Sequence, residues 1–250
     1  MALENNAAMV LFYDVEGNPV DHDDWQSHEH FHERLSVPGF RRATRWVATR
    51  WVATGGTPRN MLIYELSDVD VGTSQSYLDR LNDPTDWTRE MMPRFRGMTR
   101  GFCRVAASHG LGQGNCAFAM RFTPKAGADD RLSDWISHTV LPDAASRRGM
   151  TGVHLLAPTA PPPMTREQAL RGPDEPMPWL VMATAYDADA LERTVTELFQ
   201  PDLFREHGAG DEIAVGRYAL HHTATAAEAQ VTPQPPVLDP EQRAQNGPRL

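Results

Sequence analysis

Short apolar runs rich in Val, Ile, Trp, Tyr and Phe alternate along the chain with longer mixed stretches that lack Gly and Pro. Runs of the first kind are typical of β-strands and the mixed stretches of helices, because branched and aromatic side chains suit a pleated sheet. In the first hundred residues we predict strands at 9–14, 40–53, 60–66 and 98–108, helices at 21–35 and 74–81, and a Gly-rich turn at 54–58. The predicted order is therefore β-α-β-β-α-β.

The same order returns in the second half of the chain. Strands are predicted at 116–122, 151–157, 179–186 and 213–222, and helices at 129–147 and 188–199. The pattern D-W-x-S-H at 24–28 recurs at 134–138, and the glycines that end the two helices, Gly39 and Gly149, keep the same separation. A repeated order with repeated residues in register indicates an internal duplication. The equivalent tryptophans, Trp25 and Trp135, are expected to pin helix to sheet.

Each β-α-β-β-α-β unit predicts a four-stranded antiparallel sheet with both helices on one face, the ferredoxin-like arrangement. The other face needs cover, and a second sheet from the same chain can supply it. We therefore predict an α+β protein in which two tandem ferredoxin-like halves, 1–110 and 111–223, form an intrachain dimeric α+β barrel with a ligand cavity between the sheets. The Pro-rich stretch 158–178 is long enough to be a lid or binding loop, and 224–250 predicts a disordered or surface-hugging tail.

Composition narrows the classes of function. The formal charge of −9 argues against a nucleic-acid partner, which would need a basic face. No stretch approaches the roughly 20 apolar residues that cross a bilayer. Two cysteines, Cys103 and Cys116, exclude a disulfide framework and favour a reducing cytoplasm. The composition is also compatible with a homodimer.

Residues around the first predicted helix carry a family resemblance. The sequence from Trp25 to Phe40 contains Glu29, His30 and Arg34 and ends in Val-Pro-Gly-Phe. It resembles the W-x-x-E-H-x-x-x-R-x-x-V-P-G-F signature of EthD-like dimeric α+β barrel proteins, and a Y-E-L stretch beginning at Tyr64 is similar to another stretch of that family. The resemblance covers about the first hundred residues. It implies this fold and cofactor-free isomerases, lactone-handling enzymes, decarboxylases or monooxygenases that act on aromatic or polyketide compounds.

His30 and Arg34 are four residues apart and therefore share one helix face, with Glu29 on the adjoining stripe. A histidine that titrates near neutrality and an arginine that holds a carboxylate make an acid/base and anchor pair. The alternative is an exposed pair with no role. The second half has Val140 and Ala144 at the equivalent positions, which favours chemistry in the first half.

Other polar residues are weaker candidates. His154, in the middle of a strand, is predicted either to find a partner or to act in catalysis with His30 and Glu29. Substrate-binding candidates besides Arg34 are Arg45, Tyr64 and Trp25. Asp24, His28 and His32 follow one helix stripe and could ligate a metal, but a polar solvent face explains them better. We predict no metal and no cofactor.

These residues favour an enzyme of small-molecule catabolism. The leading hypothesis is an isomerase in which His30, assisted by Glu29, moves a proton on an acidic aromatic-derived compound such as a ring-cleavage dienoate or lactone. Arg34 or Arg45 would hold the substrate carboxylate and stabilise an enolate. The alternatives are a cofactor-free monooxygenase or cyclase of the same fold, and a non-catalytic binding protein for a hydrophobic metabolite.

Overall fold

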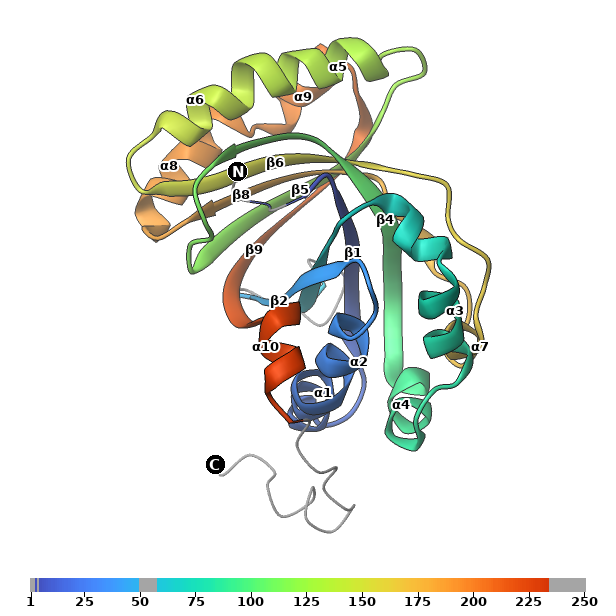
Figure 1. Cartoon of the computed structure of the whole chain (residues 1–250). Coiled ribbons are helices and arrows are strands. Elements are labelled where there is room, and N and C mark those ends of the chain that lie inside the picture. Colours follow the sequence, from blue (N-terminus) through green and yellow to red (C-terminus); the bar gives the residue numbers. More distant parts are fainter. Residues whose placement is uncertain (1–2, 4, 50–57, 234–250) are drawn as a thin grey trace.

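The computed structural model describes residues 3, 5–49 and 58–233. Its strands form one closed sheet, with helices packed on the outside (Figure 1). The strands are β1 (Ala7–Val15), β2 (Phe40–Ala48), β3 (Asn60–Leu66), β4 (Phe95–Gly110), β5 (Cys116–Pro124), β6 (Met150–Pro158), β7 (Glu175–Pro176), β8 (Trp179–Ala185) and β9 (Ala209–Thr225). Eight of them follow the order β1-β3-β2-β9-β5-β8-β6-β4, and β4 pairs with β1 to close an antiparallel barrel.

The two halves have the same topology. In the first, β4 lies beside β1, which pairs with β3, which pairs with β2; β9, β5, β8 and β6 repeat this order in the second. The halves join where β2 pairs with β9 and β4 with β6, all antiparallel. The predicted fold class, an intrachain α+β barrel of two ferredoxin-like units, is confirmed. The turn predicted at 54–58 lies, up to residue 57, outside the described residues.

The long helix of each half contains a π-helical turn. The helix predicted at 21–35 consists of α1 (Pro19–Trp25), the π-helical η1 (Gln26–His30) and α2 (Phe31–Leu35). Its counterpart consists of α5 (Asp129–Trp135), η4 (Ile136–Val140) and α6 (Leu141–Ser146). Both π turns fall on the repeated D-W-x-S-H pattern. Because π turns are rare and recur at functional sites, their presence in both halves points to an ancestral feature of this helix.

The remaining helices complete the two outer layers. They are η2 (Val69–Thr73), α3 (Gln75–Asn82), α4 (Asp86–Met91), η3 (Met92–Arg94), α7 (Arg166–Ala169), α8 (Ala188–Leu198), α9 (Pro201–His207) and α10 (Ala226–Val231). Within the segment predicted as a tail, α10 lies against α2 and β2; residues 234–250 are outside the described part. None of the described helices is long and apolar enough to cross a membrane.

Many of the side chains in the barrel interior are apolar. Alternate residues of β1 point inward, and Val10 and Phe12 pack there with Trp46, Ile63 and Tyr218. The other face of β1 contributes Met9, Leu11 and Tyr13 to a separate core beneath the helices of the first half. Large inward-facing side chains thus occupy much of the space between the two sheets, where a ligand cavity is expected from the sequence.

Candidate functional site

A small cavity lies outside the barrel, between the sheet of the first half and the helices that cover it. Its floor is the outer face of β1 and β3, which presents Tyr13 and Tyr64, and its roof is the π turn and α2. The cavity volume is about 30 Å³, enough for one or two water molecules. Apolar and aromatic side chains from β1, β3, α3, η3 and β4 form most of the remaining wall.

The roof of the cavity is polar, whereas the same helix face in the second half is apolar. The residues at equivalent positions are Gln26 and Ile136, His30 and Val140, and Arg34 and Ala144. All three residues of the second half are buried in its outer core. A duplicated scaffold has thus kept a cavity with polar groups in one half and a packed apolar core in the other. This contrast places the candidate site in the first half.

His30 is held as a neutral imidazole. Its ring lies over Trp25, with ring centroids 4.2 Å apart, and its side chain is only 8% exposed. Burial, with a further contribution from nearby Arg34, lowers the pKa of His30 well below 6.5. Its Nδ1 lies 3.4 Å from Glu33 Oε2. This contact lacks the geometry of a hydrogen bond, but the nearby carboxylate still favours the tautomer with the proton on Nδ1, which leaves Nε2 able to accept a proton.

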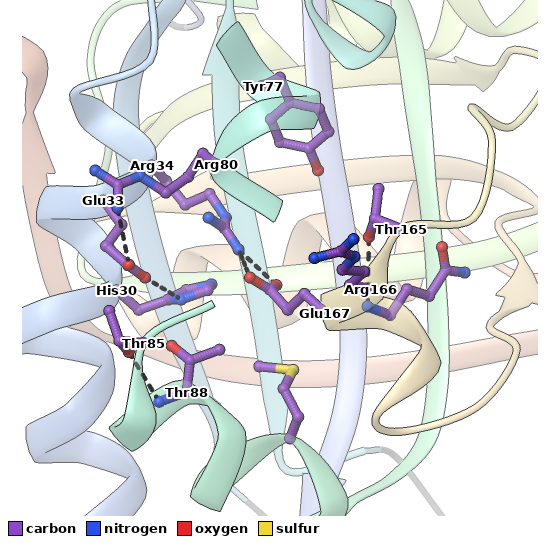
Figure 2. Close-up of polar contacts among 12 residues, drawn as sticks. His30, Glu33, Arg34, Tyr77, Arg80, Thr85, Thr88, Thr165, Arg166 and Glu167 are labelled. Atoms are coloured by element: carbon purple, nitrogen blue, oxygen red, sulfur yellow. Dashed lines mark hydrogen bonds and ion pairs between the residues drawn. The ribbon is translucent and has the colours of Figure 1, made fainter. Parts of the chain in front are cut away.

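Arg34 reaches the cavity beside His30 and meets an acid from the other half of the chain. Both carboxylate oxygens of Glu167, on α7, lie 2.5 Å from Arg34 Nη2, and Figure 2 shows His30, Arg34 and Glu167 converging. Both side chains of the pair are buried, and Arg34 lowers the pKa of Glu167 although burial opposes this. The segment 159–178 therefore closes one side of the cavity with a charged contact.

A hydrogen-bonded chain connects the floor of the cavity with the protein surface. The Tyr13 hydroxyl lies 3.1 Å from His22 Nε2, and His22 Nδ1 lies 3.1 Å from Asp23 Oδ1. The Gln26 amide donates to the Tyr64 hydroxyl over 3.1 Å. Burial raises the pKa of both tyrosines above the usual range, so both hydroxyls keep their protons. The floor of the cavity thus presents neutral hydroxyl groups to a ligand.

The structure brings together His30, Arg34, Tyr64 and Trp25 among the predicted site residues. The other three lie elsewhere. The Glu29 carboxylate accepts hydrogen bonds from Thr85 and Thr88 at the start of α4. Arg45 contacts Asp23 and His221, and His154 points into the barrel from the same face of β6 as Leu156.

Several residues that line the cavity were not predicted as site residues: Tyr13, Gln26, Tyr77, Arg100, Glu167 and Arg171. Gln26 lies inside the repeated pattern, at its one variable position, and the change from Gln to Ile between the halves was a usable signal. Nothing local marks Glu167, because its partner lies 133 residues earlier in the chain. The stripe of Asp24, His28 and His32 forms no metal-binding group with other residues in the described ranges.

Acid should destabilise this protein, because the three buried histidines His22, His30 and His154 have lowered pKa values; burial lowers the pKa of His154 to about 3. Below about pH 6.5 the unfolded chain binds protons that the folded chain does not, so stability falls as the pH falls and is unaffected by these groups above about pH 7. Each histidine contributes at most about 1.4 kcal/mol per pH unit.

Replacing His154 with Gln should therefore make the loss of stability between pH 6.5 and pH 5 less steep, by at most about 1.4 kcal/mol per pH unit. Urea unfolding of both proteins at pH 7.5, 6.0 and 5.0 measures it. His154 Nδ1 bonds to Ser108 Oγ over 2.9 Å, and an amide can replace that contact. An unchanged slope in the variant would show that His154 is protonated in the folded state.

No protein-family model matches the chain, and no curated protein matches it either. Solved structures do resemble it. An anthrone oxidase-like protein is 10% identical, with a TM-score of 0.62 over 92% of this chain and 97% of that one. A proposed monooxygenase from Fusobacterium nucleatum subsp. nucleatum is 9% identical, with a TM-score of 0.56 over 89% and 95%. Another from Lactobacillus acidophilus is 12% identical, with a TM-score of 0.53 over 89% and 97%.

At these identities the likeness concerns the fold. It extends over nearly the whole of each chain, so the complete duplicated barrel, and not one half alone, is the shared unit.

Proposed function

We propose that this protein is a cofactor-independent enzyme that removes a proton from an acidic, aromatic-derived small molecule and passes the resulting anion to molecular oxygen. The observation that carries the proposal is a buried, neutral His30 lining a cavity beside Arg34. A general base must be unprotonated at the working pH, and burial of the imidazole achieves this. The EthD-like residue pattern, which includes both residues, supports the same class of chemistry.

The cavity walls suit the anion that proton removal creates. Tyr64 accepts a hydrogen bond from Gln26, which leaves its own hydroxyl proton for a developing enolate or phenolate oxygen. Because burial raises its pKa, Tyr64 donates a hydrogen bond without giving up the proton. The apolar remainder of the wall limits the water around a bound anion, which strengthens this interaction.

Oxidation would then convert a ring CH₂ group to a ketone: one atom of O₂ becomes the ketone oxygen, and the other leaves as water with the two hydrogens of the CH₂ group. An electron-rich carbanion can react with O₂ directly, so the protein's task is to form and shield it. The similar fold of an anthrone oxidase-like protein and two proposed monooxygenases supports this outcome over others.

Isomerisation is the second candidate, and a buried neutral imidazole in the cavity wall favours it as well. An isomerase must return a proton at a second carbon, and His30 can take the proton from one carbon and give it back at the other. The Tyr13 hydroxyl, which contacts His22, keeps its proton because burial raises its pKa. Atoms balance without any oxidant.

An oxygen-uptake assay separates the two reactions. The protein is incubated with anthrone-type phenols and with ring-cleavage dienoates, with and without air, and with ¹⁸O₂. Oxidation predicts O₂ consumption and a product heavier by two mass units under ¹⁸O₂. Isomerisation predicts a product of unchanged mass that also forms without air. Turnover of neither substrate class, with binding of both, would instead support a binding protein.

The cellular compartment and the oligomeric state are also part of the proposal. Both cysteines are free thiols, which suits a reducing cytoplasm. Assembly into a homodimer stays a prediction, which sedimentation can test.

A further inference from the structure

The segment between β6 and β8 belongs to the second half but covers the cavity of the first. One end is attached where Thr159 donates to the Phe102 carbonyl through both its backbone N–H and its hydroxyl. The other end is attached where β7 pairs with β4. Between these points α7 lies against α3 (Figure 1), and the Arg166 backbone N–H donates to Asn82 Oδ1. The segment is a strap held at both ends, with α7 over the cavity.

The charged contact under this strap is incomplete on the arginine side. Glu167 directs both oxygens to the single nitrogen Nη2 of Arg34, and the buried Nη1 has no hydrogen-bond partner among the described residues. A carboxylate that meets a guanidinium side by side would use two nitrogens. A buried ion pair generally gives little net stability, because both charges lose their water. Glu167 therefore fills the arginine site without saturating it.

Apart from Glu167, the charged residues that line the cavity are arginines. Arg34, Arg100 and Arg171 line it, and Glu167 is the one acid in its wall within the described residues. Asp174 pairs with Arg100 and Arg171 from outside the wall. When Glu167 leaves, the site has an unpaired guanidinium at one end and apolar and aromatic surface along the rest. That combination recognises a carboxylate on a flat apolar body.

The small volume of the cavity also indicates that Glu167 is displaced when a substrate binds. About 30 Å³ admits water but no aromatic ring, so any substrate needs the strap to move. Withdrawal of α7 frees the Glu167 position and opens that side of the cavity at once.

We infer that Arg34 is the anchor for an aryl carboxylate and that Glu167 is a built-in substitute which the ligand carboxylate displaces as the strap opens. The inference names the substrate class of the site described above and so rests on the proposed function. Glu167 keeps the arginine neutralised while the site is empty, and the ligand must compete with it. Affinity for carboxylates is thereby set by the strap.

Calorimetric titration with 2-naphthoate and its uncharged analogue 2-naphthamide tests this. Glu167→Gln should bind 2-naphthoate at least about tenfold more tightly than the wild type, because the competing charge is gone. Arg34→Gln should lose most of the affinity for 2-naphthoate, and neither change should alter the weak binding of the amide by more than about twofold. Glu175→Gln, an exposed acid of the same strap, is the matched control and should bind like the wild type.

Hydrogen exchange supplies a second measurement. On addition of 2-naphthoate, amides of residues 165–172 should exchange faster in the wild type, because the strap opens. Equal affinity of the wild type and Glu167→Gln for 2-naphthoate would overturn the inference, and so would an equal gain in affinity for 2-naphthamide. In either case Glu167 would only fill space in the cavity. Tight carboxylate binding without any turnover would contradict the proposed function alone. Turnover of uncharged phenols, with no gain in Glu167→Gln, would contradict the inference alone.

Discussion

Replacement of His30 by Gln is expected to lower kcat by about 10²- to 10⁴-fold, the contribution usual for a positioned general base. Glutamine keeps a polar group of similar reach in the roof of the cavity but cannot accept the proton. KM should change little, because the Arg34 anchor and the apolar wall remain. Steady-state kinetics on the substrate identified by oxygen uptake measure both constants.

His28→Gln is the matched control for this experiment. His28 lies two residues earlier on the same π turn and takes no part in the cavity wall. Its replacement should leave kcat within about twofold of the wild type. If His30→Gln and His28→Gln behaved alike, with folded spectra and unchanged melting temperatures, His30 would not be the base. His22, which contacts the Tyr13 hydroxyl on the cavity floor, would then be the next candidate.

The pH dependence of kcat/KM provides an independent check. His30 works as a base only when neutral, and its pKa lies well below 6.5 because of burial and the nearby arginine. The wild type should therefore keep full kcat/KM as the pH falls from 8 to about 6.5 and lose activity only at more acidic pH. Loss of activity already between pH 8 and 7 would assign the base to another group.

The duplicated fold was predictable from sequence because its signals are local and appear twice. Alternating apolar runs define the strands, and the repeated D-W-x-S-H pattern aligns the two long helices. Gly39 and Gly149 show why such positions repeat: both have positive φ angles, and a Cβ atom at either would lie 2.4 Å from a side-chain carbon, of Val71 or of Ala190. Each constraint is set by neighbours in its own half.

The site was only partly predictable, because its remaining parts depend on contacts between distant segments. His30 and Arg34 could be chosen from their spacing and from the loss of both in the second half. The location of the cavity outside the barrel could not, since it depends on how large the inward-facing residues such as Phe12 and Trp46 are when packed together. Glu167 depends on the path of a Pro-rich strap, which no local pattern encodes.

Replacement of Trp25 by Ala is expected to destabilise the protein by about 3–5 kcal/mol, as for other large aromatic residues removed from a core. Trp25 is completely buried, contacts the His30 ring, and donates from Nε1 to Thr88 Oγ1 over 3.2 Å. Its removal leaves a cavity next to an existing one and takes the hydrogen-bond donor away from a buried hydroxyl. In a chain of this size the melting temperature should fall by roughly 6–20 °C.

The duplication supplies the matched control, because Trp135 occupies the equivalent position in the second half. Trp135 is only half-buried and stacks on His207, with ring centroids 3.8 Å apart, over a core that is otherwise apolar. Its replacement by Ala should cost about 1–2 kcal/mol. Chemical denaturation of both variants measures the difference. Equal losses would mean that the two halves still use this tryptophan in the same way, and that the cavity beneath Trp25 adds nothing to its role. A larger loss for Trp25, together with reduced turnover in Trp25→Phe, would show that the first half turned a shared packing residue into a wall of the site.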